Sequence, residues 1–120
     1  MIRILSPREE EIMQILWRLK NAYVHDILAE MPEPKPPYNT VSSIVRKLES
    51  EAMVSYEAFG KTHRYFAVLT KSQYRRFLFK RMISEYFSGS PRRLLSHFVK
   101  EEDTDPEELK RIIDHLKEEE

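Results

Sequence analysis

The sequence predicts a mainly α-helical chain that carries one small antiparallel β-hairpin. Apolar residues recur with helical spacing along most of the 120 residues. Only around residues 53–68 does the period change to two, which is typical of strands. The chain has seven prolines and two glycines, and they fall where helices or strands would begin or end. These marks divide the chain into elements that can be assigned in order.

Three helix starts are marked by a proline that follows a good capping residue. A capping side chain accepts a hydrogen bond from the first turn, and proline suits the first helical position. Glutamate three residues after the cap completes a capping box at two of the three starts. The pairs are Ser6–Pro7, Ser90–Pro91 and Asp105–Pro106, with Glu9 and Glu108 as the box glutamates.

The first half of the chain contains three predicted helices. Ile12, Met13 and Leu16 give one apolar stripe, and the helix spans about residues 7–20. A short second helix spans about 25–31, and prolines at 32, 34, 36 and 37 then prevent helix. A third helix, about 38–50, has its apolar stripe at positions 41, 44, 45 and 48.

Alternating residues then predict a hairpin that turns near Gly60. One strand includes Val54, Tyr56 and Ala58, and the other continues to Val68. Residues 22–24 are a candidate third strand. The order helix, short strand, helix, helix, hairpin is that of a winged helix-turn-helix, and we expect it to occupy residues 1–70.

Residues 71–120 predict a second, helical domain. Its helices span about 72–87, 91–99 and 106–118, and three short helices cannot bury their apolar side chains alone. A second copy of the chain supplies the missing surface most simply, although packing onto the hairpin domain is the alternative. The candidate dimerisation residues are Tyr74, Phe77, Tyr86, Phe87, Leu94, Leu95, Phe98, Ile112, Ile113 and Leu116.

The formal net charge of zero conceals an uneven distribution. Residues 1–70 are neutral, residues 71–100 carry a net +7 and residues 101–120 a net −7. Blocks of like charge repel themselves, so the basic and acidic segments are expected to lie against each other. The alternative is two solvated helix faces of opposite sign.

The third helix and the hairpin tip combine the side chains that DNA recognition requires. Short hydroxyl and amide side chains allow close approach to base edges, and Arg and Lys reach phosphates or guanine. No acidic residue lies between positions 38 and 48, and none lies at the tip. For each surface, the alternative is an ordinary solvated face, and the two features together favour DNA more than either does alone. The candidate DNA-binding residues are Asn39, Thr40, Ser42, Ser43, Arg46, Lys47, Lys61, His63 and Arg64.

Several segments together resemble the penicillinase repressor family of BlaI, MecI and CopY types. They are Leu5 to Trp17, the run from Tyr38 to Leu48, the hairpin end at Arg64–Phe66 and the stretch from Tyr86 to Asp103. The resemblance implies a winged helix that binds palindromic operator DNA, with bases read by the third helix, and a C-terminal domain that dimerises. The rival interpretation is a winged helix that binds another protein and no DNA.

The sequence departs from that family at three places. Some members are inactivated by a membrane sensor protease that cleaves an Asn–Phe bond, and the matching pair here is His97 and Phe98. Copper-responsive members carry a cysteine-rich tail, whereas this chain has no cysteine. Glu51 and Ala52 stand where members commonly have Lys and Gly, which predicts an altered turn after the third helix.

Other classes of function find little support in the residues. Two glycines cannot form a phosphate-cradling loop, the four histidines lack ligand spacing, and no nucleophile is grouped with a base. We therefore expect no enzyme activity, no cofactor, no metal and no small-molecule substrate. No apolar run approaches the length that spans a bilayer, and we expect a cytoplasmic protein.

Overall fold

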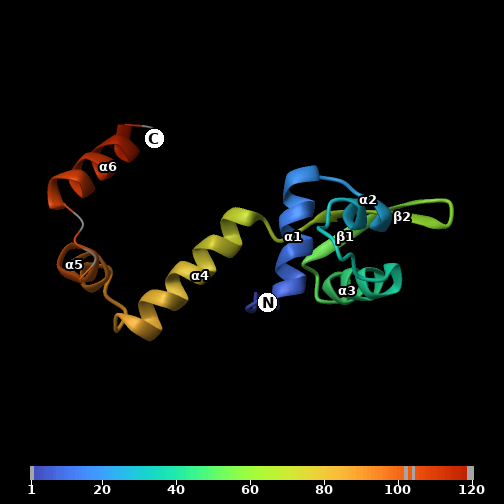
Figure 1. The fold of residues 1–120 in the computed structure, drawn as a ribbon, viewed down its shortest axis with the longest axis horizontal. Helices are drawn as coiled ribbons and strands as arrows, with labels where there is room; N and C mark the ends of the chain where they lie inside the picture. The colour runs from blue at the N-terminus through green and yellow to red at the C-terminus, as the bar shows by residue number, and fades with distance from the viewer. Residues whose placement is uncertain (1, 102, 104, 119–120) are drawn as a thin grey trace. The chain divides into compact units, whose positions relative to one another are not determined.

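A computed structural model describes residues 2–101, 103 and 105–118, without the side chains of 116–118 (Figure 1). It confirms a mainly helical fold with a two-stranded antiparallel sheet, as in a winged helix-turn-helix. The elements, in order, are α1 Pro7–Leu19, α2 Val24–Ala29, α3 Tyr38–Ser50, β1 Val54–Phe59, β2 Thr62–Ala67, α4 Lys71–Tyr86, α5 Pro91–Glu101 and α6 Pro106–Glu118.

The chain forms two compact units, Met1–Phe77 and Leu78–Glu120. The division falls inside α4, several residues beyond the boundary expected at residue 70. Tyr74 accounts for this, because its side chain is buried in the first unit and its hydroxyl accepts a hydrogen bond of 3.0 Å from the Leu5 backbone N–H. Its ring also lies 6.1 Å from that of Trp17. Tyr74 therefore belongs to the core of the first unit, and its buried ring is not offered to a second copy of the chain.

The first core lies where α1, α2, α3 and the hairpin meet. Ser6 caps α1 with the predicted box: its hydroxyl accepts from the Glu9 backbone N–H at 3.2 Å, and the Glu9 carboxylate accepts from the Ser6 backbone N–H at 2.8 Å. The apolar stripes of α1 and α3 face inward together. The residues with the least exposure are Ile12, Met13, Leu16, Ile27, Val41, Val45, Leu48 and Val54.

The hairpin pairs Tyr56 with Tyr65 and turns at Gly60, whose φ of +63° is a conformation that glycine adopts without strain. The candidate strand at residues 22–24 is only a single bridge between Ala22 and Tyr65. α2 begins one residue earlier than expected, at Val24, because the Asp26 carboxylate accepts from the Tyr23 backbone N–H at 2.9 Å and caps the helix.

The end of α2 is held by Lys35 from the proline-rich loop. Its Nζ donates to the carbonyl oxygens of Leu28, Ala29 and Met31 at 3.0, 2.9 and 2.8 Å. The last carbonyls of a helix lack intrahelical partners and attract a cation. α2 ends at Ala29, two residues earlier than the sequence predicts, and Lys35 binds carbonyls at that end and just beyond it.

α3 has the bounds that the sequence predicts, and an unusual turn follows it. Ala52 adopts a φ of +62°, a left-handed conformation that costs a residue with a Cβ about 1–2 kcal/mol. Glu51 ends the helix and pairs with Arg3 at 2.6 Å. The turn into β1 is therefore formed despite the absence of glycine, at a conformational cost.

The second unit leaves much of its apolar surface exposed. Within the part described, Ile83 and Leu94 are buried, whereas Phe87 is half-buried. Ser90 and Asp105 cap α5 and α6 as expected, accepting from the backbone N–H groups of Arg93 and Glu107. The side chain of Leu116 lies outside the described residues. Large exposed apolar side chains are Phe79, Met82, Tyr86, Leu95, Phe98, Ile112 and Ile113.

Candidate nucleic-acid interface

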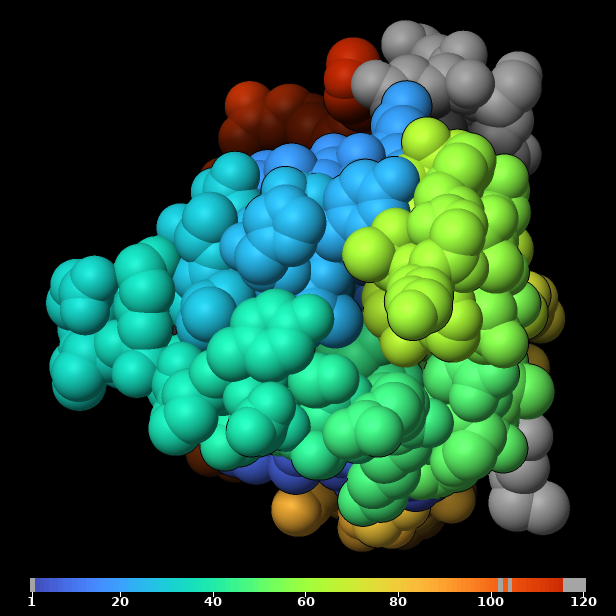
Figure 2. All heavy atoms as spheres, turned by 90° about the vertical axis from the view of Figure 1, so that its right-hand side faces the viewer, coloured from blue at the N-terminus to red at the C-terminus, as the bar shows by residue number. Residues whose placement is uncertain are grey.

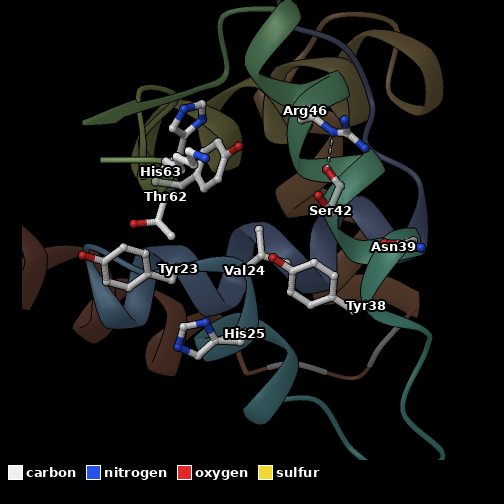
Figure 3. A pocket seen from close by; sticks show the side chains of 11 residues that line it. Tyr23, Val24, His25, Tyr38, Asn39, Ser42, Arg46, Thr62 and His63 are labelled. Carbon is white, nitrogen blue, oxygen red and sulfur yellow. Dashed lines mark hydrogen bonds between the residues drawn. The ribbon is translucent and has the colours of Figure 1, made fainter. Parts of the chain in front are cut away.

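A groove of about 420 Å³ lies between the start of α2, the outer face of α3 and the tip of the hairpin (Figure 3). Not one of the eleven residues that line it is acidic, although the chain has 20 Asp and Glu. Arg46 and Lys61 supply positive charge, and tyrosine, histidine, amide and hydroxyl side chains supply hydrogen-bonding groups. The groove is therefore suited to an anionic partner with polar edges.

The local sequence explains how α3 forms one wall. Val41, Val45 and Leu48 are fully buried and fix the rotation of the helix. Asn39 and Arg46 consequently point outward, and Ser42 lies at the edge of the groove. In Figure 2, α3 and the hairpin lie side by side on one face of the first unit, with α2 next to them. A helix with this outward face meets the geometric requirement for entry into a major groove.

Five of the nine predicted DNA-binding residues line the groove: Asn39, Ser42, Arg46, Lys61 and His63. Arg46 is exposed, and its Nε donates to the Ser42 carbonyl oxygen at 3.4 Å, a long contact that leaves its other donors outward (Figure 3). Thr40 and Ser43 are exposed on α3 but do not line the groove.

The structure places Arg64 apart from the groove. Strand residues alternate between faces, so Arg64 and His63 point to opposite sides of the hairpin. Arg64 lies opposite Glu57, with 3.7 Å between Nη2 and Oε2, and its guanidinium lies 4.8 Å from the ring centre of Phe59. His63 stacks on Tyr56, with ring centres 3.9 Å apart. The hairpin thus presents His63, and not Arg64, to the groove.

Lys47 is also not a groove residue. It lies on α3 toward α1, and its Nζ is 3.4 Å from the Glu9 carboxylate. Glu9 is almost completely buried and is bound by Arg3 at 2.6 Å. The hydrogen bonds from Arg3 hold the pKa of Glu9 well below its ordinary value of 4.5, so the carboxylate is ionised at neutral pH. Lys47 is therefore engaged within the protein while most of its side chain stays exposed.

Six residues of the groove are absent from the predicted set: Tyr23, Val24, His25, Tyr38, Thr62 and Tyr65. Tyr23 and His25 stack on each other at the start of α2, and burial raises the pKa of the Tyr65 hydroxyl. The signal for Tyr23 and His25 was the short helix itself, because a helix-turn-helix brings the start of α2 beside α3. Tyr65 had no comparable signal in the sequence.

Comparison with known proteins places the chain in a family. The model of the penicillinase repressor family matches residues 5–118, nearly the whole sequence. The chain belongs to the penicillinase repressor family. This is a family of transcriptional regulators, and the resemblance stated from the sequence is thereby confirmed.

Several curated members are similar over most of their length. The methicillin resistance regulatory protein MecI of Staphylococcus aureus strain N315 is 23% identical over 109 residues, covering 90% of this chain and 89% of the relative. MecI of Mammaliicoccus sciuri is 22% identical over the same shares. Among solved structures, AF1382 from Archaeoglobus fulgidus matches 64% of this chain and 84% of its own, with 24% identity and a TM-score of 0.45.

The part of the chain that the structure describes contains neither a membrane-spanning helix nor a cluster of metal-ligand residues. None of the helices described is long and apolar enough to cross a membrane. Within the same residues, His, Asp and Glu form no group of three that is placed to hold a metal ion.

Proposed function

We propose that the protein is a dimeric transcriptional repressor that binds a palindromic operator through α3 and the hairpin, the wing of the fold. The groove without acidic residues is the observation that carries this proposal, because such a lining suits a polyanion. Membership of a family of transcriptional regulators supports the same partner.

The proposed complex contains two kinds of contact, one to base edges and one to the sugar-phosphate backbone. α3 enters the major groove, where Asn39, Ser42 and Arg46 reach base edges, and a bidentate Arg contact to guanine discriminates among bases. Lys61 and His63 on the wing contact the sugar-phosphate backbone, which adds affinity and little sequence information. Tyr23 and His25 face the wing across the groove and join the backbone contacts (Figure 3).

Dimerisation is proposed through the second unit. Tyr86 is 75% exposed and Phe79 51% exposed, and Leu95, Phe98, Ile112 and Ile113 are exposed as well. A small unit with this much apolar surface gains stability when a second copy covers it. Two copies present two α3 helices to two half-sites, so occupancy of a promoter palindrome blocks transcription. The +7 and −7 segments add attraction between the copies that salt screens.

A salt titration tests DNA binding most directly. We expect the protein to bind a duplex containing the promoter of its own gene at low salt, and the affinity to fall steeply as salt is added. Absence of binding at low salt would contradict the proposal and favour a winged helix that binds protein. A palindrome identified by footprinting, with protection of two half-sites about one helical turn apart, would establish the operator geometry.

We also propose that a membrane sensor protease relieves repression by cleaving the chain in the second unit. The His97–Phe98 bond lies inside α5, so cleavage requires local opening of that helix before a protease binds it in extended form. Co-expression with a candidate sensor protease, followed by mass analysis, should yield one fragment that ends at His97 and one that begins at Phe98. Intact chain after induction of the protease would reject this route.

A further inference from the structure

Arg3 connects the start of α1 to the end of α3 through two carboxylates. Its guanidinium donates to Glu9 at 2.9 and 2.6 Å and to Glu51 at 2.6 and 3.0 Å. A fifth hydrogen bond reaches the carbonyl oxygen of Ile4 at 3.1 Å. Guanidinium has five N–H donors, and each of them has an acceptor here. Arg3 is thus the main countercharge for both glutamates.

Lys47 lies beside the same two carboxylates. Its Nζ is 3.4 Å from Oε2 of Glu9, and Glu51 follows four residues later, at the end of the same helix. The Glu9 side chain is 4% exposed, whereas that of Lys47 is 62% exposed. A carboxylate this buried requires a cationic partner, and Arg3 meets that need with two short hydrogen bonds. Lys47 can then leave Glu9 at little cost.

We propose that Arg3 is a positioning residue for Lys47: by neutralising Glu9 and Glu51, it leaves the Lys47 ammonium available for a DNA phosphate at the α1 edge of α3. The inference rests on the proposed DNA-binding function. It assigns Arg3 and Glu9 an indirect role, because neither contacts DNA in this arrangement.

Removal of Arg3 makes the consequence measurable. Glu9 would then have Lys47 as its nearest cation, and Glu51, four residues along the chain from Lys47, would attract the same ammonium. Lys47 would be held against the protein and would no longer reach a phosphate. For every phosphate that a protein ceases to neutralise, the magnitude of the negative slope of log affinity against log salt falls by about 0.9.

The experiment compares wild type, Arg3→Met and Arg3→Met/Glu9→Gln by salt titration on a random-sequence duplex of about 30 base pairs, which isolates backbone contacts. Arg3→Met is expected to lower the magnitude of the slope by about 0.9, and adding Glu9→Gln should restore the wild-type slope because Lys47 is released. A slope unchanged in Arg3→Met, or equally low in both variants, would overturn the proposal. The second result would mean that Arg3 itself contacts DNA or only stabilises the fold.

A matched pair at the same end of α1 controls for the loss of charge. Arg8 and Glu11 form an exposed ion pair at 2.7 Å. If Arg8→Met lowers the slope, Arg8→Met/Glu11→Gln should not restore it. Circular dichroism and thermal unfolding identify a temperature at which every variant is folded.

If Arg3→Met does not fold, Glu9→Gln and Glu11→Gln decide the question in its place. With Arg3 in place, Glu9→Gln should leave the salt slope as unchanged as Glu11→Gln does, because Arg3 already neutralises Glu9 and frees Lys47. A steeper salt slope in Glu9→Gln alone would overturn the proposal, because it would mean that Glu9 holds Lys47 despite Arg3. Absence of DNA binding by the wild type would instead reject the proposed function, so the two failures are distinguishable.

Discussion

Ala22 and Tyr65 exchange both backbone hydrogen bonds, at 3.0 Å from Ala22 N–H to the Tyr65 oxygen and 2.8 Å in the reverse direction. This single bridge joins the segment between α1 and α2 to the second strand of the wing. The start of α2 and the wing thereby become two walls of the groove, and α3 forms the third (Figure 3). The most important prediction concerns the arginine in that groove.

Arg46→Ala should weaken specific operator binding by about 1–3 kcal/mol, because a base-reading arginine supplies that much discrimination. A gel-shift titration on the cognate operator measures the change. Arg18→Ala is the matched control, since Arg18 is exposed and pairs with Glu30 at 3.2 Å outside the groove. Equal affinity of wild type and Arg46→Ala would remove Arg46 from the recognition set.

Ile112→Asp should shift the dimer toward monomer. Ile112 is exposed on α6, and a buried interface would have to desolvate the new carboxylate without a partner. We expect the dissociation constant from sedimentation to rise by at least about 10-fold, or 1.4 kcal/mol. Val68→Asp places the same charge at an exposed apolar position of the first unit and should leave the dimer intact. A wild type that is monomeric at micromolar concentration would contradict dimerisation itself.

The Arg3–Glu9 pair should make the free energy of unfolding depend on pH. The pKa of Glu9 is below its ordinary value of 4.5 in the folded protein, so its contribution is fully present above pH 4.5 and is lost as the pH falls through the folded pKa. In urea unfolding, the free energy of unfolding of the wild type should therefore exceed that of Glu9→Gln at neutral pH, and the difference should shrink below pH 4.5. A constant difference from neutral pH down to acid would contradict this assignment. Glu11→Gln gives the background effect of an exposed carboxylate.

Ala52→Gly should stabilise the protein. A Cβ at a left-handed φ costs about 1–2 kcal/mol, and glycine loses roughly 0.5–1 kcal/mol more conformational entropy on folding, which leaves a gain of about 0.5–1 kcal/mol. Chemical unfolding measures the gain. Ala29→Gly is the control, because Ala29 lies within α2 and glycine there should destabilise. A loss of stability in Ala52→Gly would mean that the turn is not strained by alanine.

Lys35→Met should loosen the end of α2. The substitution keeps the length of the side chain and removes three hydrogen bonds to helix-terminal carbonyls, so we expect a loss of about 1–2 kcal/mol. Hydrogen exchange should show reduced protection confined to α2 and the following loop. Lys20→Met, at the exposed end of α1, controls for the loss of a surface charge. Unchanged exchange in Lys35→Met would show that water replaces the ammonium without cost.

Most of the secondary structure follows from local patterns in the amino-acid sequence. The Ser–Pro and Asp–Pro pairs marked the starts of α1, α5 and α6, and apolar periodicity predicted the observed bounds of α3. The change to a period of two predicts the hairpin. The polar face of α3 predicts that Asn39, Ser42 and Arg46 face outward, and all three line the groove. These features depend on residues within a few positions of one another, so a linear pattern records them.

Tertiary packing, in contrast, selected the candidate side chains that share a surface. Hairpin register turned His63 into the groove and Arg64 away from it, and burial of Tyr74 drew the start of α4 into the first unit. Arg3 binds Glu9, the carboxylate next to Lys47, and joins Glu51 across 48 positions, and Tyr74 meets Leu5 across 69. Such contacts leave no periodic trace in the sequence, because packing of whole elements brings their partners together.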